Sequence, residues 1–222
     1  MNRPEVIALD VIETLFSLEP LGARFKQAGL PEAAMHLFFA QMLRDSFALE
    51  ASRVYKPFRE IAAGSLAVVM ATNGVSPDQP KLESVLAGFA ELPAHPDVAA
   101  GLERLHRSGV RLITLTNGGA DNTKKLLARS GLERFIERAV SIDEVRHWKP
   151  NREVYLHAAR VSGVAPERMT LVAAHAWDVH GAKQAGLRAA WVKRQDTLYQ
   201  PAMSPPDVQG DSIIAVAEAL LA

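Results

Sequence analysis

Polar side chains that could carry out chemistry follow several short apolar runs of this sequence. Asp10 comes directly after the first run, which is an unusual place for a charge. Thr116 and Asn117 end the second run before two glycines and a helical segment, so hydroxyl, amide and free backbone N–H groups converge as an anion site requires. Lys149 and Asp178 come later in the chain. The order Asp, Thr, Lys, Asp therefore predicts one constellation.

The elements that must position these side chains are predicted to be buried parallel strands. The apolar runs lack polar alternation, which is typical of strands covered by helices on both faces, and the later three each follow a helical segment that ends in glycine. This pattern predicts an α/β fold, a Rossmann-like parallel sheet with helices on both faces, whose ligands bind beyond the carboxyl ends of the strands. The runs are 6–9, 110–115, 171–174 and 189–192, and the helical segments are 98–109, 151–163 and 178–186.

Between the first two strands, helical periodicity replaces the strand pattern. Pro31 and Pro57 open two helical segments, and a third spans 82–92. An insert with no sheet to complete is expected to form a small bundle above the strand ends and to act as a lid. We therefore expect a core domain of residues 1–15 and 93–222 and a helical cap domain of residues 16–92. Asp211 or Ser212 is expected to cap a closing helix.

Composition excludes several classes of function. The 222 residues include 25 Lys plus Arg and 25 Asp plus Glu, so no net positive charge favours nucleic acid or an anionic membrane. The absence of cysteine removes disulfides, thiolate metal sites and thiol nucleophiles. The N-terminal stretch has only four consecutive apolar residues, too few for a signal segment or a membrane span. A soluble, cytoplasmic protein with a small-molecule partner is expected.

Four sequence motifs, in order and separated by a helical insert, resemble those of the haloacid dehalogenase superfamily over nearly the whole chain. They are DVIET, ITLTNGG, HWKPNREVY and LVAAHAWDVHGA. The resemblance implies that Asp10 is a nucleophile that forms an ester with substrate, which water then hydrolyses. It also implies that Lys149 orients Asp10 and offsets its charge, that Asp178 helps to position the hydrolytic water, and that Thr14 completes the catalytic set.

Two missing acids distinguish between branches of that superfamily. Its phosphatases carry one Asp two residues after the nucleophile and another early in the fourth motif, and here those positions are Ile12 and Ala173. A phosphomonoester needs leaving-group protonation and a cation, whereas halide leaves as a stable anion and carboxylate attack on carbon needs no metal. The resemblance is therefore greatest to the type II (S)-2-haloacid dehalogenases, which implies a small 2-haloacid substrate and no metal or other cofactor.

The same resemblance implies which residues contact substrate. Thr116 and Asn117 would bind the substrate anion, and an Ala-Trp-Asp triplet in the fourth motif matches the dehalogenases. Leu43, Phe58 and Trp177 stand at positions where that family lines its apolar substrate pocket. The other expected substrate-binding residues are Tyr155, Phe39 and His175. Those dehalogenases are commonly dimers, so a homodimer is a further expectation.

Three departures from the dehalogenase pattern stand close to these positions. Ile12 and Glu13 replace a Tyr and a Gly of the first motif, which adds a carboxylate near the nucleophile. Phe39 stands where that family has a cap arginine that receives halide. Ala174 and His175 replace a Ser-Asn pair, which could bring an imidazole toward the site. The arginines that could substitute for the missing one are Arg24, Arg44 and Arg53.

Alternative interpretations follow from these departures. One is a magnesium-dependent phosphatase of a small metabolite. Another is a catalytically retired protein that binds small anions. Among the individual residues, Asp10 and Asp178 could each simply cap a following helix, and His175 could be a hydrogen-bonded local substitution.

Overall fold

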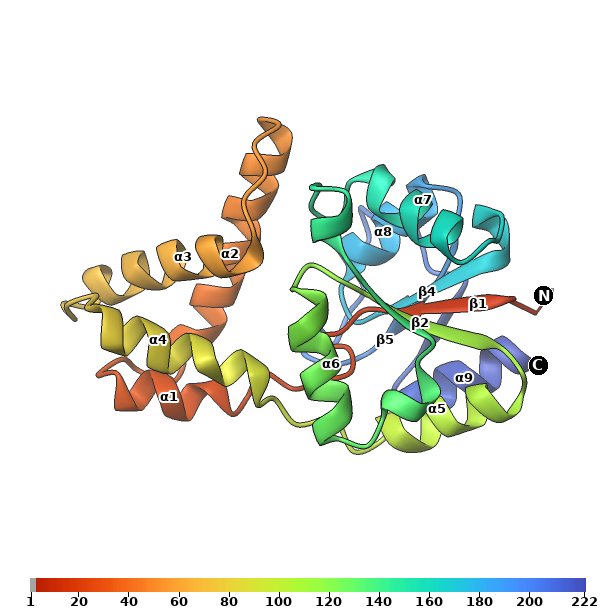
Figure 1. Cartoon of the computed structure of the whole chain (residues 1–222), viewed down its shortest axis with the longest axis horizontal. Coiled ribbons are helices and arrows are strands. Elements are labelled where there is room, and N and C mark those ends of the chain that lie inside the picture. The colour runs from red at the N-terminus through yellow and green to blue at the C-terminus, as the bar shows by residue number, and fades with distance from the viewer. Residues whose placement is uncertain (1–2) are drawn as a thin grey trace. The chain divides into compact units, whose positions relative to one another are not determined.

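The computed structural model describes residues 3–222, and this part of the chain divides into two compact units. Ser17–Leu92 form a helical unit. The described residues up to Phe16, together with Pro93–Ala222, form an α/β unit (Figure 1). Among residues 3–222 no helix combines the length and apolar character needed to cross a bilayer.

The α/β unit is built on one parallel sheet of six strands. Their order is β3-β2-β1-β4-β5-β6, so successive connections run outward from β1 in one direction and then, from β4, in the other. The boundary between β1 and β4 is therefore the topological switch point, where ligands bind in doubly wound folds. The strands are β1 (Val6–Leu9), β2 (Arg111–Thr116), β3 (Arg138–Ser141), β4 (Met169–Ala173), β5 (Arg188–Val192) and β6 (Val208–Gly210).

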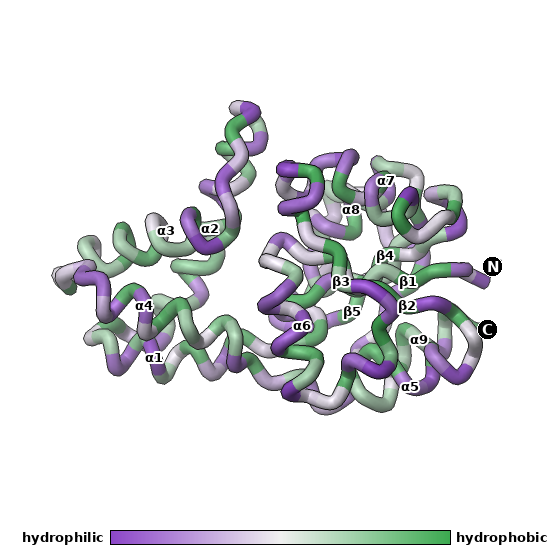
Figure 2. The backbone as a smooth tube through the Cα atoms, viewed as in Figure 1, coloured by the Kyte–Doolittle hydropathy of each residue, from purple (hydrophilic) through white to green (hydrophobic). Residues whose placement is uncertain are grey.

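The strand register brings the motif residues to one edge of the sheet. Leu9, the last residue of β1, lies opposite Thr114 of β2 on one side and Val172 of β4 on the other. Asp10 and the residues that follow β2 and β4 consequently emerge from the same carboxyl edge. Figure 2 shows the apolar character of the central strands, which matches their burial.

Helices cover both faces of the sheet (Figure 1). Helices α5 (Val98–Arg107) and α9 (Ile213–Leu221) pack together on one face. Helices α7 (Arg152–Val161) and α8 (Ala176–Gln184) pack together on the other. Helix α6 (Ala120–Arg129) connects β2 with β3. The α/β prediction is therefore confirmed.

Helix ends follow ordinary capping chemistry. The side chain of Asn151 accepts a hydrogen bond from the Glu153 N–H at the start of α7, and Ser212 accepts one from the Ala215 N–H at the start of α9. Ser212, one of the two residues expected to cap the closing helix, does so. Glycines at the crossings allow close approach: a Cβ on Gly101 of α5 would lie 2.5 Å from the Ile213 side chain.

The structure also corrects the sequence-based elements. Strands β3 and β6 were not predicted, because each is short and carries no continuous apolar run. The interpretation of Asp178 as a helix cap is wrong, since α8 begins at Ala176 and its cap position is His175. The interpretation of Asp10 as a cap is also wrong, because a turn follows it and the first helix begins only at Leu21.

The helical unit consists of α1 (Leu21–Gln27), α2 (Ala34–Ala51), α3 (Phe58–Thr72) and α4 (Gln79–Ala87), followed by a short turn of 3₁₀ helix. Pro57 precedes α3, as its position in the sequence predicted, whereas α1 was not predicted. Aromatic rings form the interior of this unit: Phe38 lies 5.5 Å from Phe25 and 6.3 Å from Phe89, between ring centroids.

Candidate active site

Asp10 lies at the carboxyl end of β1 with its carboxylate held on both oxygens. Lys149 Nζ donates to Asp10 Oδ1 at 2.8 Å, and the Thr14 hydroxyl donates to Asp10 Oδ2 at 2.6 Å. The side chain of Asp10 is 8% exposed, so it is nearly enclosed but not sealed. A carboxylate fixed in this way has a defined orientation, which a nucleophile requires.

Lys149 joins Asp10 to the second carboxylate of the site. Its Nζ also donates to Asp178 Oδ2 at 2.7 Å, and the Tyr155 hydroxyl donates to Asp178 Oδ1 at 2.6 Å. The side chains of Lys149 and Asp178 are both 0% exposed. Gly181 of α8 permits this arrangement, because a Cβ there would lie 2.6 Å from the Tyr155 hydroxyl oxygen.

The pKa shifts follow from burial and from these ion pairs. Burial opposes ionisation of Asp10, but the charge of Lys149 and the contacts with His175 outweigh it and hold the pKa of Asp10 well below its usual value. Burial likewise opposes the charge on Lys149, yet the two carboxylates raise its pKa. For Asp178, burial raises the pKa and is only partly offset by Lys149. Asp10 is therefore a carboxylate and Lys149 an ammonium over the physiological pH range.

The loop that carries Thr14 is tied to β4 and to a distant arginine. The Ala174 N–H donates to the Thr14 hydroxyl at 2.9 Å, which orients that hydroxyl toward Asp10. The Arg194 guanidinium donates to the Thr14 carbonyl at 3.1 and 3.2 Å and pairs with Asp97. These contacts stabilise the backbone beside the nucleophile.

Thr116 and Asn117 take part in the local structure of the second motif. The Thr116 hydroxyl accepts a hydrogen bond from the Gly118 N–H at 2.9 Å, and the Asn117 side-chain oxygen accepts one from the Lys149 N–H at 3.1 Å. Ser141, at the end of β3, donates to the Gly118 carbonyl. The loop after β2 is thus linked directly to the backbone of Lys149.

An imidazole lies on the other side of the nucleophile. His175 Nδ1 is 3.4 Å from Asp10 Oδ2, and His175 Nε2 is 2.7 Å from Glu13 Oε2. The ring stacks on Trp177 with centroids 5.0 Å apart. Burial alone would lower the pKa of His175, but the hydrogen bonds and charges of Asp10 and Glu13 outweigh it and raise that pKa to about 10. The ring is therefore an imidazolium at neutral pH.

The expected substrate contacts from the insert belong to the helical unit. Phe39 and Leu43 lie on α2, where Phe39 is buried and Leu43 is half-buried. Phe58 begins α3 and packs edge-on against Phe89, with centroids 5.2 Å apart. Their contact with substrate therefore stays a prediction.

The three arginines considered as halide receptors also belong to the helical unit. Arg24 donates to the Ser84 carbonyl and pairs with Glu91, while Arg44 pairs with the adjacent Asp45. Arg53 is exposed and has a positive φ. Within the α/β unit, the cations that the structure places against Asp10 are instead Lys149 and His175.

The donor set does not fit a magnesium ion. The two carboxylates nearest to each other at the site, those of Asp10 and Asp178, are already paired with the Lys149 ammonium. Across residues 3–222 no three His, Cys, Asp or Glu side chains are arranged to hold a metal. Ile12 and Ala173 supply no oxygen ligand from their side chains.

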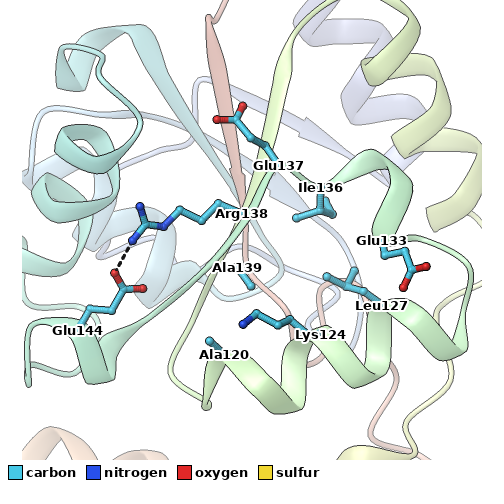
Figure 3. A pocket seen from close by; sticks show the side chains of 9 residues that line it. All are labelled: Ala120, Lys124, Leu127, Glu133, Ile136, Glu137, Arg138, Ala139 and Glu144. Atoms are coloured by element: carbon cyan, nitrogen blue, oxygen red, sulfur yellow. Dashed lines mark hydrogen bonds and ion pairs between the residues drawn. The ribbon is translucent and has the colours of Figure 1, made fainter.

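A hollow of about 640 Å³ lies elsewhere on the α/β unit, beside the edge strand β3 and helix α6 (Figure 3). Its lining includes none of the side chains of Asp10, Thr116, Lys149 or Asp178. The ion pair between Arg138 and Glu144 spans one side of it. Its lining is mainly surface carboxylates and aliphatic groups, so it does not compete with the carboxylate cluster as a candidate catalytic centre. The residues are Ala120, Lys124, Leu127, Glu133, Ile136, Glu137, Arg138, Ala139 and Glu144.

Sequence reasoning missed several residues that support the site. Arg194 and Asp97 lie far from any motif, and no local signal marks them. His95 contacts the Glu13 carbonyl through Nε2 at 3.1 Å, and Trp191 donates to the Ala174 carbonyl at 2.8 Å. Trp191 lies within the predicted apolar run 189–192, so only its indole N–H could have indicated a polar role.

Comparison with known proteins identifies related sequences. The family model described as haloacid dehalogenase-like hydrolase matches residues 4–186. The (S)-2-haloacid dehalogenase H-109 of Pseudomonas putida is 24% identical over 208 residues, which is 93% of each chain. Haloacetate dehalogenase H-2 of Moraxella sp. (strain B) is 24% identical over 209 residues, again 93% of each chain.

A solved structure shows that the fold is shared over nearly the full length. The L-2-haloacid dehalogenase of Xanthobacter autotrophicus, with chloropropionic acid covalently bound, superposes with a TM-score of 0.91. It is 22% identical, and the match covers 98% of each chain.

Proposed function

We propose that this chain, which belongs to the haloacid dehalogenase-like hydrolases, releases halide from a small 2-haloacid through an ester formed on Asp10. The observation that carries the proposal is the Lys149 ammonium bridging Asp10 and Asp178. It leaves Asp10 ionised and oriented for attack, at a site where the side chains of Ile12 and Ala173 supply no further acid.

In the first step, a carboxylate oxygen of Asp10 attacks the carbon that bears the halogen. The C–O bond forms as the carbon–halogen bond breaks, and the halide leaves with the bonding electron pair. Lys149 and Thr14 hold the carboxylate in one orientation, which makes attack by a weak nucleophile effective. Because halide is a stable anion, the absence of an acidic side chain at Ile12 does not hinder its departure.

In the second step, water attacks the ester carbonyl on Asp10 and releases a 2-hydroxyacid. Lys149 stays paired with Asp178 as the charge of Asp10 disappears and returns, so the ammonium keeps a carboxylate partner throughout. Asp178, held by Tyr155 and Lys149, would help to position the water. No metal or other cofactor takes part in either step.

Substrate recognition is assigned to groups near the carboxyl edge of the sheet. Thr116 and Asn117, with the backbone N–H groups that follow them, would bind the substrate carboxylate. The aromatic wall of the pocket would include Trp177. The remaining proposed contacts are Tyr155 and His175 of the α/β unit and Phe39, Leu43 and Phe58 of the helical unit.

The test is a halide-release assay. Purified protein is incubated with 2-chloropropionate, 2-bromopropionate and chloroacetate, and Asp10→Asn serves as the matched control because it keeps the shape of the side chain but removes the nucleophile. The proposal expects halide release by the wild type and none above background by the variant. Equal halide release by both proteins, or none by either, would contradict it.

The magnesium-dependent phosphatase is distinguished in the same experiment. The wild type is also incubated with a panel of small phosphomonoesters in the presence and absence of magnesium. Turnover that depends on magnesium would replace the proposed function with that alternative.

A further inference from the structure

Two residues that depart from the dehalogenase pattern meet each other beside the nucleophile. Glu13 Oε2 lies 2.7 Å from His175 Nε2, and the opposite ring nitrogen, Nδ1, lies 3.4 Å from Asp10 Oδ2. A carboxylate on one imidazole nitrogen and a reacting group beside the other is the arrangement of a general base that is oriented by an acid. Stacking on Trp177 holds the plane of the ring.

The backbone at Glu13 is strained, which an incidental surface carboxylate would not require. Its φ is +64°, in the left-handed region that glycine adopts without steric cost. The Glu13 N–H donates to the Phe16 carbonyl at 2.8 Å, and the Glu13 carbonyl contacts His95 Nε2 at 3.1 Å, so this conformation is fixed from both sides. Strain of this kind, where the side chain contacts an imidazole beside the nucleophile, points to a functional role.

Asp178 is less suited than His175 to take a proton from water. Both oxygens of Asp178 already accept hydrogen bonds, one from Tyr155 and one from Lys149, and its side chain is 0% exposed. The side chains of His175 and Glu13 are 13% and 16% exposed. These two side chains therefore border solvent, while Nδ1 itself is covered beside Asp10.

We propose that Glu13 and His175 form a catalytic dyad in which His175 is the general base for hydrolysis of the Asp10 ester, and Glu13 positions it. This role rests on the proposed function, because it acts on the ester that halide displacement creates. It assigns to Asp178 the task of holding Lys149 and orienting water, and the proton transfer itself to His175.

The proton movements of the dyad balance over one hydrolysis of the ester. Once Asp10 is an ester, the imidazolium releases one proton to solvent, and the neutral ring can accept a proton at Nδ1. Water then bonds to the Asp10 carbonyl carbon as Nδ1 takes one of its protons. The tetrahedral intermediate collapses by breaking the bond from that carbon to the alkyl oxygen, which receives the proton from His175. Ionisation of the regenerated Asp10 acid returns a proton to His175.

The charges around the ring favour this sequence. In the free enzyme two carboxylates face the imidazole, those of Asp10 and Glu13, and together they raise its pKa to about 10. Ester formation removes the charge of Asp10 and leaves Glu13 alone, so the pKa of His175 falls when a base is needed. Two other charged groups of the site contact neighbours of the ring: Lys149 contacts Asp10, and Arg194 contacts the Thr14 carbonyl.

The decisive experiment separates the two chemical steps. Enzyme in excess over 2-chloropropionate is quenched at successive times, and chloride and the mass of the Asp10-containing peptide are both measured. We expect His175→Gln to release chloride within about tenfold of the wild-type rate but to accumulate the ester, with ester breakdown slowed about 100-fold or more. His180→Gln is the matched control, because His180 contacts Ser204 and lies outside the dyad.

The positioning role of Glu13 has its own readout. Glu13→Gln keeps the size of the side chain but removes its charge, so ester breakdown is expected to slow about tenfold and its pH profile to shift to lower pH, while Glu13→Asp restores part of the rate. A purely structural contact would change the rate without moving the pH profile.

The outcomes distinguish this inference from the proposed function. No chloride from the wild type would overturn both. If the wild type releases chloride and the ester breaks down equally fast in His175→Gln, the dyad alone is overturned. The dyad is also overturned if His175→Gln releases no chloride in the single turnover. As an independent check, the His175 pKa measured by NMR should fall in Asp10→Asn, which mimics the neutral ester; an unchanged pKa would also overturn the dyad.

Discussion

The two oxygens of the Asp10 carboxylate have charged neighbours that differ in burial and in contact distance. On the Oδ1 side, Lys149 and Asp178 are 0% exposed, and their contacts are 2.7 and 2.8 Å long. On the Oδ2 side, His175 is 13% exposed, and its nearer ring nitrogen lies 3.4 Å away. One side is part of the interior of the fold, and the other borders water.

This difference separates two tasks that a covalent hydrolase must perform. The buried side fixes the nucleophile and keeps it ionised, which requires few changes during turnover. The bordering side must admit water and exchange protons, which requires groups that can change their charge. The motif resemblance accounts for the first side, whereas residues that depart from that resemblance, Glu13 and His175, build the second.

The largest expected effect comes from the residue that both sides share. Asp10→Asn removes the nucleophile, and halide release from 2-chloropropionate should fall by at least about 10⁴-fold, as in other enzymes that lose a covalent nucleophile. The rate is measured as released chloride, with circular dichroism as the control for folding. A variant with a tenth of the wild-type rate would show that Asp10 is not the nucleophile.

Breaking the buried side should destabilise the fold. Lys149→Met leaves two carboxylates buried without their cation, which should cost about 3–5 kcal/mol in the free energy of unfolding by urea. Lys193→Met is the matched control, since Lys193 pairs with exposed Asp211 at 3.9 Å and should change stability by about 0.5 kcal/mol or less. Equal losses in the free energy of unfolding for the two variants would contradict the stabilising role of the buried Lys149 ion pairs.

Removing His175 from the solvent-bordering Oδ2 side should change how the free energy of unfolding depends on pH. The pKa of His175 is raised from 6.5 to about 10 in the folded protein, so its stabilising contribution is complete below pH 6.5 and is lost as the pH rises toward 10. His175→Gln should therefore flatten that decline, which is on the order of a few kcal/mol, in urea unfolding at pH 6, 8 and 9.5. Parallel curves for wild type and variant would contradict the ion pair.

The smallest effect is expected at Gly181, which packs against Tyr155 behind the buried Asp178 carboxylate. In Gly181→Ala the new methyl group would crowd Tyr155 and Pro150, which should cost about 1–3 kcal/mol on thermal unfolding and weaken the hydrogen bond to Asp178. Gly64→Ala is the control, because nothing lies within 4 Å of that exposed helical position and the change should stabilise by up to about 1 kcal/mol. Opposite signs are expected for the two variants.

Much of the architecture was predictable from the chain alone. Continuous apolar runs ending in Asp10 or Thr116 reveal buried parallel strands, because covered strands need no polar alternation. Strands β3 and β6 escaped because edge strands of three or four residues lack such a run. Helix α1 escaped because it has only seven residues.

The candidate site was predictable only in part. The order of the motifs indicated that Asp10, Lys149 and Asp178 converge, and the structure brings all three together with Thr14 and Tyr155. The pairing of Glu13 with His175 could not be inferred, because 162 positions separate them and only the folded register makes them neighbours. The same applies to Arg194 and Thr14.

The most direct test of the central claim follows oxygen from water during a single turnover. Wild-type enzyme in excess over 2-chloropropionate reacts in water enriched in the heavy oxygen isotope, and both the Asp10-containing peptide and the product are weighed by mass spectrometry. An ester on Asp10 hydrolysed at its carbonyl carbon predicts heavy oxygen in the Asp10 carboxylate and none in the 2-hydroxyacid. Heavy oxygen in the 2-hydroxyacid, with an unlabelled Asp10, would contradict the account.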